Sequence, residues 1–346
     1  MTARTHAEIP SRRALLALGM AVFCASAADA QTPAEFYKGR TVTLVVSSTS
    51  GGGYDTMGRT IAKYLGAHLP GNPRVVVSNM PGAGGIVAMN YFYRSAPKDG
   101  TFIAAMQNNT PFEPLLGTKE AQYDATKFNW LGSPSVEVGL IAVWRTVPVN
   151  SIADLKKREI TVGSSGANST PSFYARLLNE TLGTKMKIVV GYPGMNEVYF
   201  AMERHEVDGF PSLFYNTLTA TRPNWRKDIK LLLQYGLEKE PAIPDVPSAL
   251  DLVTDPDDRL LLQAGLAEVT LGRPYLMPPG VPADRVAAMR KAFADMFRDA
   301  GFLADATRMS LGVSSSKTGE QIQQLIADTY RTPPKTIDRL RKLSLH

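Results

Sequence analysis

The segment TVTLVVSSTSGGGYD, residues 41–55, decides the fold. Its first six residues form a short apolar run, which is typical of a strand buried on both faces. A polar turn with three successive glycines at 51–53 follows, and a helical pattern extends from about Asp55 to Leu65. A strand, a glycine-rich turn and a helix in this order predict one unit of a layered α/β fold.

The same order recurs along the chain. Apolar runs predict further strands, and amphipathic patterns predict helices between them. Because the connections are short, we expect parallel β–α–β units with helices on both faces of the sheet. Predicted strands cover 74–77, 101–106, 138–143, 160–162, 187–190, 207–210 and 229–233, and predicted helices cover 86–94, 171–182, 197–204, 282–302 and 320–330.

Length and charge limit the kind of protein. A chain of 346 residues exceeds the size at which one hydrophobic core usually stops growing, so we expect two lobes. The formal net charge of +6 is scattered along the chain. Nucleic-acid binding requires a basic stripe with interleaved aromatic residues, which the sequence lacks. A mildly basic surface suits an anionic solute.

The first thirty residues have the pattern of a secretory signal. Arg12 and Arg13 precede an apolar stretch at 14–27 that is too short to span a bilayer. The small residues at 28–30 match a signal peptidase site, so we expect cleavage near Ala30 and Gln31 and a periplasmic mature chain. A buried N-terminal helix is the alternative.

Few residues could hold a metal ion or act as a nucleophile. Cys24 is the only cysteine and lies inside the predicted signal. The mature chain would then have no disulfide and no thiolate site. Its histidines, His68, His205 and His346, do not have the spacing of metal ligands. We therefore expect neither a metal nor a cofactor.

Two glycine-rich loops, at 48–55 and 81–85, stand directly before predicted helices. Glycine lets the backbone approach a ligand closely, and a helix N-terminus offers unpaired N–H groups and positive partial charge. These loops are therefore candidate anion sites, although such a turn also occurs simply as a tight turn.

Two further loops come from the second half of the chain. The loop at 163–171 supplies the hydroxyls of Ser164 and Ser169, with Thr170 as the expected N-cap of the next helix. The loop at 191–194 contains Tyr192. Helix N-termini that converge from both sides of a cleft would hold a carboxylate.

Other chemistries fit the sequence less well. The first glycine loop is not followed by the Lys-Ser/Thr of a Walker motif, and Val87 replaces the final glycine of a dinucleotide fingerprint. A cleft hydrolase would have to use Ser164 and His205, and it stays an alternative. Asp55 and Asp208 could form an acid–base pair, but capping of the following helix is the simpler role for Asp55.

A set of short motifs resembles the extracytoplasmic solute receptors of tripartite tricarboxylate transporters, the Bug or TctC-like family. The motifs follow the family order from residue 36 to the C-terminus, so the set as a whole is specific. They are FYKGR (36–40), GGGYD (51–55), PGAGG (81–85), KDG (98–100), YD (123–124), LGS (131–133), GS (163–164), STP (169–171), YPG (192–194), VD (207–208), PDVP (244–247) and PPGVP (278–282).

The resemblance implies a type II periplasmic binding protein, with two Rossmann-like α/β lobes joined by a double-crossover hinge. Lobe 1 would comprise 31–140 plus 266–346, and lobe 2 would comprise 141–265. It implies a monomeric, non-enzymatic protein that passes a small organic carboxylate to the large and small membrane subunits of a transporter. A solute-sensing receptor for a two-component system is the alternative.

The resemblance also carries ligand binding onto particular residues. Family members grip one ligand carboxylate through the backbone of the first glycine loop and ordered waters, and lobe 2 contacts the far end of the ligand. The matching positions are Ser48, Thr49, Gly53, Tyr54, Asp55, Gly82, Ala83, Gln107, Asn108, Ser164, Ser169, Thr170, Tyr192 and Ser212.

Three of these positions depart from the family pattern. Many relatives have an aromatic residue where this chain has Ser48, and relatives that bind amino-bearing ligands have Asp near the position of Ser212. Tyr54 replaces a small residue and would narrow the site. We therefore expect a ligand without an ammonium group, either a di- or tricarboxylate or an aromatic acid.

Overall fold

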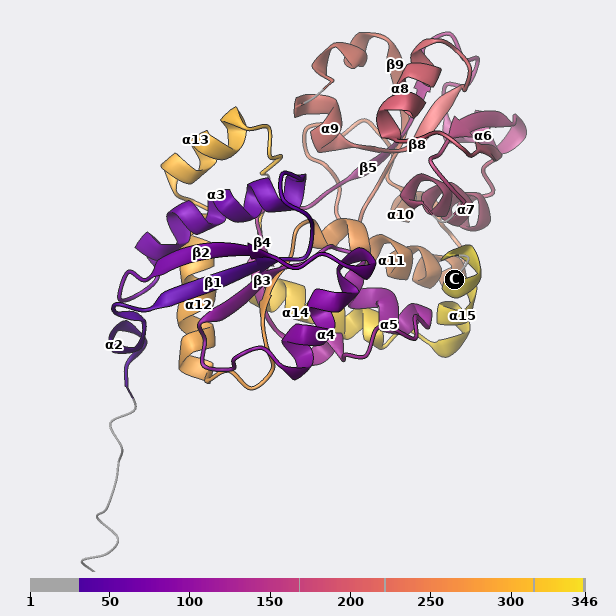
Figure 1. The fold of residues 1–346 in the computed structure, drawn as a ribbon. Coiled ribbons are helices and arrows are strands. Elements are labelled where there is room, and N and C mark those ends of the chain that lie inside the picture. The colour runs from indigo at the N-terminus through magenta and orange to yellow at the C-terminus, as the bar shows by residue number, and fades with distance from the viewer. Residues whose placement is uncertain (1–30, 168, 221, 314, 345–346) are drawn as a thin grey trace, which may run out of the picture.

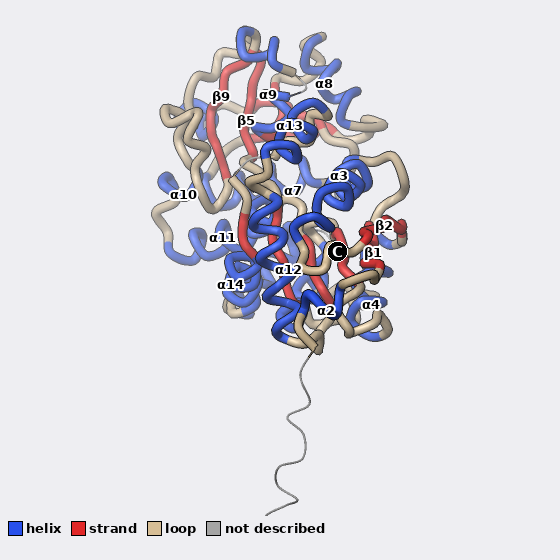
Figure 2. Tube along the Cα trace, turned by 90° about the vertical axis from the view of Figure 1, so that its left-hand side faces the viewer, coloured by secondary structure: helices blue, strands red, loops and turns tan. Residues whose placement is uncertain are grey.

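The computed structural model describes residues 31–344 except 168, 221 and 314. The signal peptide predicted for residues 1–30 lies outside this part of the chain. Figures 1 and 2 show two lobes, each built on its own sheet. The predicted α/β class and the two-lobed architecture are confirmed.

The sheet of lobe 1 contains the apolar strand predicted at residues 41–46. Its strands are β1 Thr41–Val46, β2 Arg74–Asn79, β3 Phe102–Ala105, β4 Asn129–Ser133, β10 Tyr275–Met277 and β11 Lys317–Thr318, in the order β11-β4-β10-β3-β1-β2. The first strand pairs in parallel with β2 on one side and with β3 on the other. This arrangement places the loops after these three strands at one edge of the sheet.

Helices cover both faces of this sheet. They are α2 Pro33–Tyr37, α3 Gly53–His68, α4 Ile86–Arg94, α5 Glu113–Leu116, α12 Ala283–Met296, α13 Ala300–Arg308 and α14 Gly319–Tyr330. Alternate residues of β1 point to opposite faces. Leu44 joins a core cluster with residues of α3, α12 and α13, while Val45 joins another with residues of α4 and α14.

Lobe 2 repeats the design with five strands in the order β7-β6-β8-β5-β9. The strands are β5 Gly139–Trp144, β6 Ile160–Gly163, β7 Met186–Val189, β8 Gly209–Phe214 and β9 Ile229–Tyr235. The helices are α6 Ile152–Lys157, α7 Thr170–Leu182, α8 Met195–Glu203 and α9 Tyr215–Ala220. Besides the first strand and helix, the sequence predicts seven strands and five helices, and six of these strands and four of these helices closely overlap observed elements. The predicted strand at 207–210 is shifted to β8 at Gly209–Phe214, and the predicted helix at 282–302 is divided into α12 and α13.

The expected parallel β–α–β units are present among β1, β2 and β3 and among β6, β7 and β8, but each sheet also contains antiparallel strands. In lobe 1, β10 runs antiparallel to β3 and β4, and β11 runs antiparallel to β4. In lobe 2, β5 runs antiparallel to β8 and β9. The physical reason is the double crossover: β5 and β10 are the first strands after a crossing, so they enter their sheets from the direction of the other lobe.

The two crossings join the sheets as a double hinge. Residues 134–138 connect β4 to β5, and residues 236–274 connect β9 to β10 through α10 Ala249–Leu252 and α11 Pro256–Leu271. The lobe boundaries predicted at 140/141 and 265/266 fall within β5 and α11, and they stay approximate predictions.

Two helices that the sequence patterns did not predict contact both lobes. In α11, Leu261 and Leu266 belong to the core of lobe 2, whereas Ala267 and Leu271 belong to a core cluster of lobe 1. From Leu261 onward most residues of α11 are buried against one lobe or the other, so this part of the helix has no clear amphipathic period to detect. The last helix, α15 Pro334–Ser344, packs against α11, α7 and α5.

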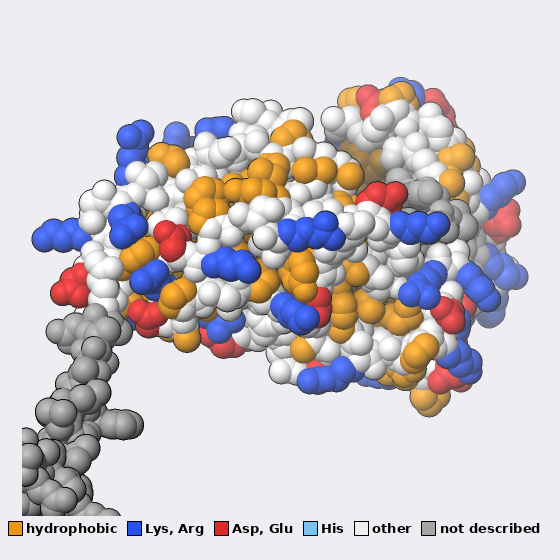
Figure 3. Space-filling view, turned by 60° about the horizontal axis from the view of Figure 1, so that its bottom comes forward, with side chains coloured by type: hydrophobic (Ala, Val, Ile, Leu, Met, Phe, Trp, Pro, Cys, Tyr) orange, Lys and Arg blue, Asp and Glu red, His pale blue; other side chains and the backbone are white. Residues whose placement is uncertain are grey.

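The surface agrees with the dispersed charge of the sequence. Lys and Arg side chains are spread over the face drawn in Figure 3 and alternate with apolar and acidic side chains. Within the described ranges, no helix has both the length and the apolar composition needed to cross a bilayer.

Candidate ligand-binding site

The loops after β1, β2 and β3 meet at one edge of lobe 1. The backbone N–H of Gln107 donates to the Ser47 hydroxyl at 3.2 Å. Gly85, with φ of 100°, lies so close to Thr110 that an added Cβ would be 2.9 Å from the Thr110 methyl carbon. Figure 1 shows α3 starting on the side of lobe 1 that faces lobe 2. The loops gathered here contain Ser48, Thr49, Gly53, Gly82, Ala83, Gln107 and Asn108.

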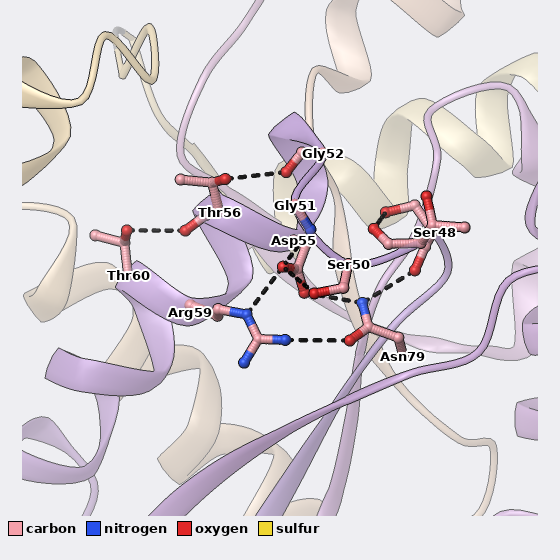
Figure 4. Close-up of polar contacts among 10 residues, drawn as sticks. Ser48, Ser50, Gly51, Gly52, Asp55, Thr56, Arg59, Thr60 and Asn79 are labelled. Atoms are coloured by element: carbon pink, nitrogen blue, oxygen red, sulfur yellow. Dashed lines mark hydrogen bonds and ion pairs between the residues drawn. The ribbon is translucent and has the colours of Figure 1, made fainter.

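Asp55 holds the first glycine loop in shape (Figure 4). Its carboxylate is buried and accepts hydrogen bonds from the Gly51 N–H at 2.9 Å, from Asn79 Nδ2 at 2.8 Å and from Arg59 Nε at 2.9 Å. These partners, Arg59 first, hold the pKa of Asp55 well below its ordinary value. The capping role expected for Asp55 is wrong, because α3 begins at Gly53 with Gly52 as its N-cap and Asp55 lies within the first turn. Its carboxylate instead binds the Gly51 N–H of the loop, and its contact with a ligand stays a prediction.

Tyr54 connects the first glycine loop to the loop after β3. Its hydroxyl accepts a hydrogen bond from the backbone N–H of Asn108 at 3.2 Å. The guanidinium carbon of Arg273 lies 5.7 Å from the centroid of the Tyr54 ring. The Nη1 atom of Arg273 donates to the Gly53 carbonyl at 3.0 Å. A cation therefore stands at the start of α3.

Arg273 was not among the predicted site residues. It forms no ion pair with any residue that the structure describes, although its charge acts on Glu137, whose pKa burial raises and Arg273 lowers. It adjoins the positive end of a helix dipole, where an added cation is unfavourable. An anion at this place would relieve the repulsion. Arg273 lies 220 residues from Gly53 in sequence, so only an isolated arginine between Gly272 and Pro274 marked it.

In the serine loop of lobe 2, residues 163–172, the hydroxyl groups form hydrogen bonds with one another and with the backbone of the loop. The Ser164 hydroxyl is 0% exposed, lies 2.6 Å from the Ser169 hydroxyl and accepts a hydrogen bond from Ser172 at 2.7 Å. All three hydroxyl oxygens also lie within hydrogen-bond distance of the Gly166 carbonyl oxygen, at 3.1 Å for Ser164, 2.8 Å for Ser169 and 2.7 Å for Ser172. The N-cap of α7 is Ser169 and not Thr170, which is the first residue of the helix. As ligand contacts, these residues stay predictions.

The other two predicted residues of lobe 2 lie in different settings. Tyr192 is half-buried and packs near β6, since a Cβ added at Gly163 would be 3.4 Å from its ring. Ser212 is buried within β8. Both stay predictions as ligand contacts.

A pocket of about 320 Å³ lies between the lobes. Lobe 1 contributes Gln107, Asn108 and Phe112, and lobe 2 contributes Thr170 and Phe173. Residues of α11 and α15 line the rest. The structure thus brings three predicted residues, Gln107, Asn108 and Thr170, into one pocket, while the glycine loops, Ser164, Ser169 and Tyr192 do not line it.

Two carboxyl groups line this pocket, and neither was predicted. Glu113 accepts hydrogen bonds from Asn109 Nδ2 at 2.9 Å and from the Thr118 hydroxyl at 2.5 Å. The Glu268 carboxylate has no hydrogen bond or ion pair within the described part of the chain. Burial, and to a smaller extent the charge of Glu113, raises the pKa of Glu268 to about 7.

The hydrolase alternative has little geometric support. The Ser164 hydroxyl is engaged by its own loop, as described above. The ring of His205 packs edge-on against Trp144, with the ring centroids 5.8 Å apart. Among residues 31–344 with the gaps noted, no group of three or more His, Cys, Asp or Glu side chains is placed to hold a metal ion.

Comparison with known proteins identifies relatives of the chain. It is 26% identical over 229 residues to the UPF0065 protein in the TAR-I ttuE-ttuC' intergenic region of Agrobacterium vitis, and the match spans 61% of each protein. It is 27% identical over 256 residues to the UPF0065 protein in the gbd 5' region of Cupriavidus necator, which covers 69% of this chain and 72% of the relative.

Solved structures share the fold. A TctC solute binding protein from Polaromonas has a TM-score of 0.69 at 19% identity, covering 89% of this chain and 98% of that one. An R. palustris protein solved with adipate has a TM-score of 0.58 at 19% identity, with 88% and 97% covered. MatC from Rhodopseudomonas palustris, solved with bound malate, has a TM-score of 0.55 at 21% identity, with 88% and 99% covered.

The family-level comparison covers most of the chain. The sequence model of the tripartite tricarboxylate transporter family receptor, TctC, matches residues 58–340. This range contains both sheets except β1, both crossings of the hinge and every lining residue of the inter-lobe pocket except Ser344. The chain therefore belongs to the TctC family of tripartite tricarboxylate transporter receptors.

Proposed function

We propose that this chain is a periplasmic solute-binding protein that captures a small carboxylate and delivers it to the membrane subunits of a tripartite tricarboxylate-type transporter. The observation that carries the proposal is a pocket built from both lobes. Its residue Asn108 donates a hydrogen bond to Tyr54 in the first glycine loop, where the Arg273 guanidinium contacts the start of α3. A ligand that contacts both lobes would favour hinge closure by as much as it binds the closed state better.

The first carboxylate would bind at the lobe 1 edge of the site. Arg273 offers a planar fork of N–H donors, which suits a carboxylate, and the amides of the first glycine loop surround the start of α3. The neighbours solved with adipate and with malate support a carboxylate as the ligand class. Catalysis is not part of the proposal.

The proposal that the ligand lacks an ammonium group rests on positions where this chain differs from the pattern of its family. Ser48 stands where many relatives have an aromatic residue, and Ser212 stands near the position where amino-binding relatives have Asp, so the proposed ligand has no ammonium group. It is a di- or tricarboxylate or an aromatic acid, and Tyr54 narrows the site beside it.

A screen of organic acids tests the proposal. Native mass spectrometry of freshly purified protein would reveal a retained small acid, and a thermal-shift screen of carboxylates would rank candidates. Because a ligand that binds only the folded state raises the melting temperature, at least one carboxylate should produce a concentration-dependent rise. If an amino acid is preferred over every simple acid, the finer class is wrong, and if no carboxylate stabilises the protein, the function is wrong.

A further inference from the structure

The last helix, α15, is attached firmly to lobe 2. Its Leu340 and Leu343 are buried in the lobe 2 core with residues of α7 and α11. Arg339 pairs with Glu180 of α7 at 2.8 Å and with Asp258 of α11 at 2.6 Å, and its side chain is only 26% exposed. Two carboxylates that share one partly buried guanidinium stabilise more than an isolated surface ion pair. Buried leucines and this charge network therefore hold α15 on lobe 2.

The helix before α15 belongs to lobe 1. Ile322 and Ile326 of α14 are buried in a core cluster of lobe 1, and the Tyr330 hydroxyl donates to the Pro111 carbonyl at 2.8 Å. Residues 331–333 therefore cross from lobe 1 to lobe 2. This connection joins two helices and not the two sheets, so it is additional to the two crossings of the hinge.

α15 also contacts lobe 1, at the short helix α5 beside it (Figure 1). Arg341 Nε donates to the Leu115 carbonyl at 2.9 Å, in the last turn of α5, where helix carbonyls lack partners within the helix. Leu115 packs against the core of lobe 1, whereas Leu116 packs against the lobe 2 core that contains Leu340. Leu116 and Leu340 also line the inter-lobe pocket, so the contact between α5 and α15 borders that pocket.

The two attachments of α15 differ in strength. On lobe 2, α15 has buried leucines and the shared Arg339 guanidinium. On lobe 1, it has one hydrogen bond from Arg341, which is 45% exposed, and the half-buried Leu116. A rotation of one lobe against the other must change one of these two sets of contacts, and the weaker set costs less to break. α15 should therefore move with lobe 2, away from α5.

We infer that the hydrogen bond from Arg341 to the Leu115 carbonyl is a latch that keeps α15 on α5, and that it opens when the lobes separate. Arg341 is not among the described residues that line the pocket, so it is a positioning residue and not a ligand contact. Breaking the latch widens the pocket from the side of α5 and shifts the unliganded chain toward the open arrangement. This motion is a property of the chain without a solute.

Distance measurements between two spin labels test the latch in the expected mature chain, which has no cysteine of its own. The labels are attached to Lys119→Cys, which follows α5, and to Lys156→Cys on α6 of lobe 2, both exposed positions. Arg341→Gln should raise the ratio of the longer-distance to the shorter-distance population by about fivefold, because one hydrogen bond from a charged but half-exposed donor is lost. Arg341→Lys keeps a charged donor and should cause a smaller rise.

Asp338→Asn is the matched control. It removes the ion pair that Asp338 forms with Arg341 at 3.0 Å but keeps the bond to Leu115, so the distance ratio should stay at the wild-type value. The latch is overturned if Arg341→Gln leaves the ratio unchanged, even where it lowers stability toward urea, or if Asp338→Asn raises the ratio as much. Should Arg341→Gln fail to fold, Arg341→Lys decides, and no rise in that variant overturns the latch. Since no solute is present, these outcomes are independent of carboxylate binding, which the screen of organic acids decides.

Discussion

Asp55, in the first turn of α3, and Glu268, which lines the inter-lobe pocket from α11, are two carboxyl groups with opposite environments. Asp55 accepts hydrogen bonds from Gly51, Asn79 and Arg59, and its pKa is lowered. Glu268 has no such partner in the described chain, and its pKa is raised to about 7. The comparison indicates that a carboxylate whose oxygens accept hydrogen bonds stabilises a loop. A carboxylate without such partners lowers the stability of the folded protein and stays available to a ligand.

Removing the hydrogen-bonded carboxylate of Asp55 should have the largest effect on the free energy of unfolding. Asp55→Ala leaves Arg59, Asn79 and the Gly51 N–H without their acceptor, so we expect a loss of about 3 kcal/mol in the free energy of unfolding. Urea denaturation measures it. Asp328→Asn, which removes an exposed ion pair on α14, is the control and should change stability by less than about 0.5 kcal/mol. Equal losses for the two variants would mean that the Asp55 network is not structural.

The pH dependence of Asp55 follows from its lowered pKa. Because the folded protein holds the carboxylate ionised more strongly than the unfolded chain does, the stabilisation is fully present above the ordinary pKa of 3.8. It is lost as the pH falls below that value. The stability difference between wild type and Asp55→Ala should therefore shrink in acid, and a difference that is constant from pH 6 to pH 3 would contradict the assignment.

The dependence of stability on pH that Glu268 causes should have the opposite sign to that caused by Asp55. Its folded pKa is raised from 4.5 to about 7, so the folded protein loses stability relative to the unfolded chain as the pH rises between these values. Glu268→Gln removes the ionisation, and above pH 7 it should be more stable than wild type by on the order of 2 kcal/mol. Thermal unfolding at pH 5 and pH 8 measures the change. A variant with no advantage at pH 8 would show that Glu268 has partners in solution.

Arg273 should affect binding more than folding. Arg273→Gln removes the guanidinium beside Gly53, so affinity for a carboxylate found in the screen should fall by about tenfold or more. Arg273→Lys keeps the charge but loses the planar fork and should recover only part of the affinity. Calorimetric titration of all three proteins measures this, and an unchanged affinity in Arg273→Gln would place the carboxylate elsewhere.

The smallest effect is expected in the serine loop of lobe 2. Ser172→Ala removes one neutral hydroxyl from the network with Ser164 and the Gly166 carbonyl. The loss should be about 1 kcal/mol, because Ser169 still donates to Gly166. Urea denaturation beside Asp55→Ala gives the comparison. A loss as large as that of Asp55→Ala would mean that neutral and charged loop networks contribute equally here.

Local patterns predicted much of the fold. The strand at 41–46 and the helix at 86–94 have the predicted bounds, because a buried strand and an amphipathic helix each leave a clear period in the sequence. Several of the missed elements lack that signal, although α15, which was also missed, is amphipathic. β10 has three residues and β11 has two, while α11 from Leu261 onward is covered by both lobes and shows no clear amphipathic period. The predicted helix at 282–302 is divided into α12 and α13, since Asp299 caps a new helix.

The candidate site was predictable only in part. Gln107, Asn108 and Thr170 could be named because they follow strands or start a helix. Arg273 and Glu268 could not, because their importance depends on which groups surround them after folding. Glu268 belongs to a helix without a recognisable pattern, and Arg273 meets Gly53 only through the hinge.

The sequence by itself determined the two-lobed α/β fold, the glycine-rich loops before helices and the family, since these depend on short-range periodicity and on motifs in order. The tertiary structure alone decided the direction of the crossover strands, the walls of the pocket and the contrast between Asp55 and Glu268. The physical reason is that hydrogen bonding and burial, which set the pKa of a carboxyl group, come from residues far apart in the chain.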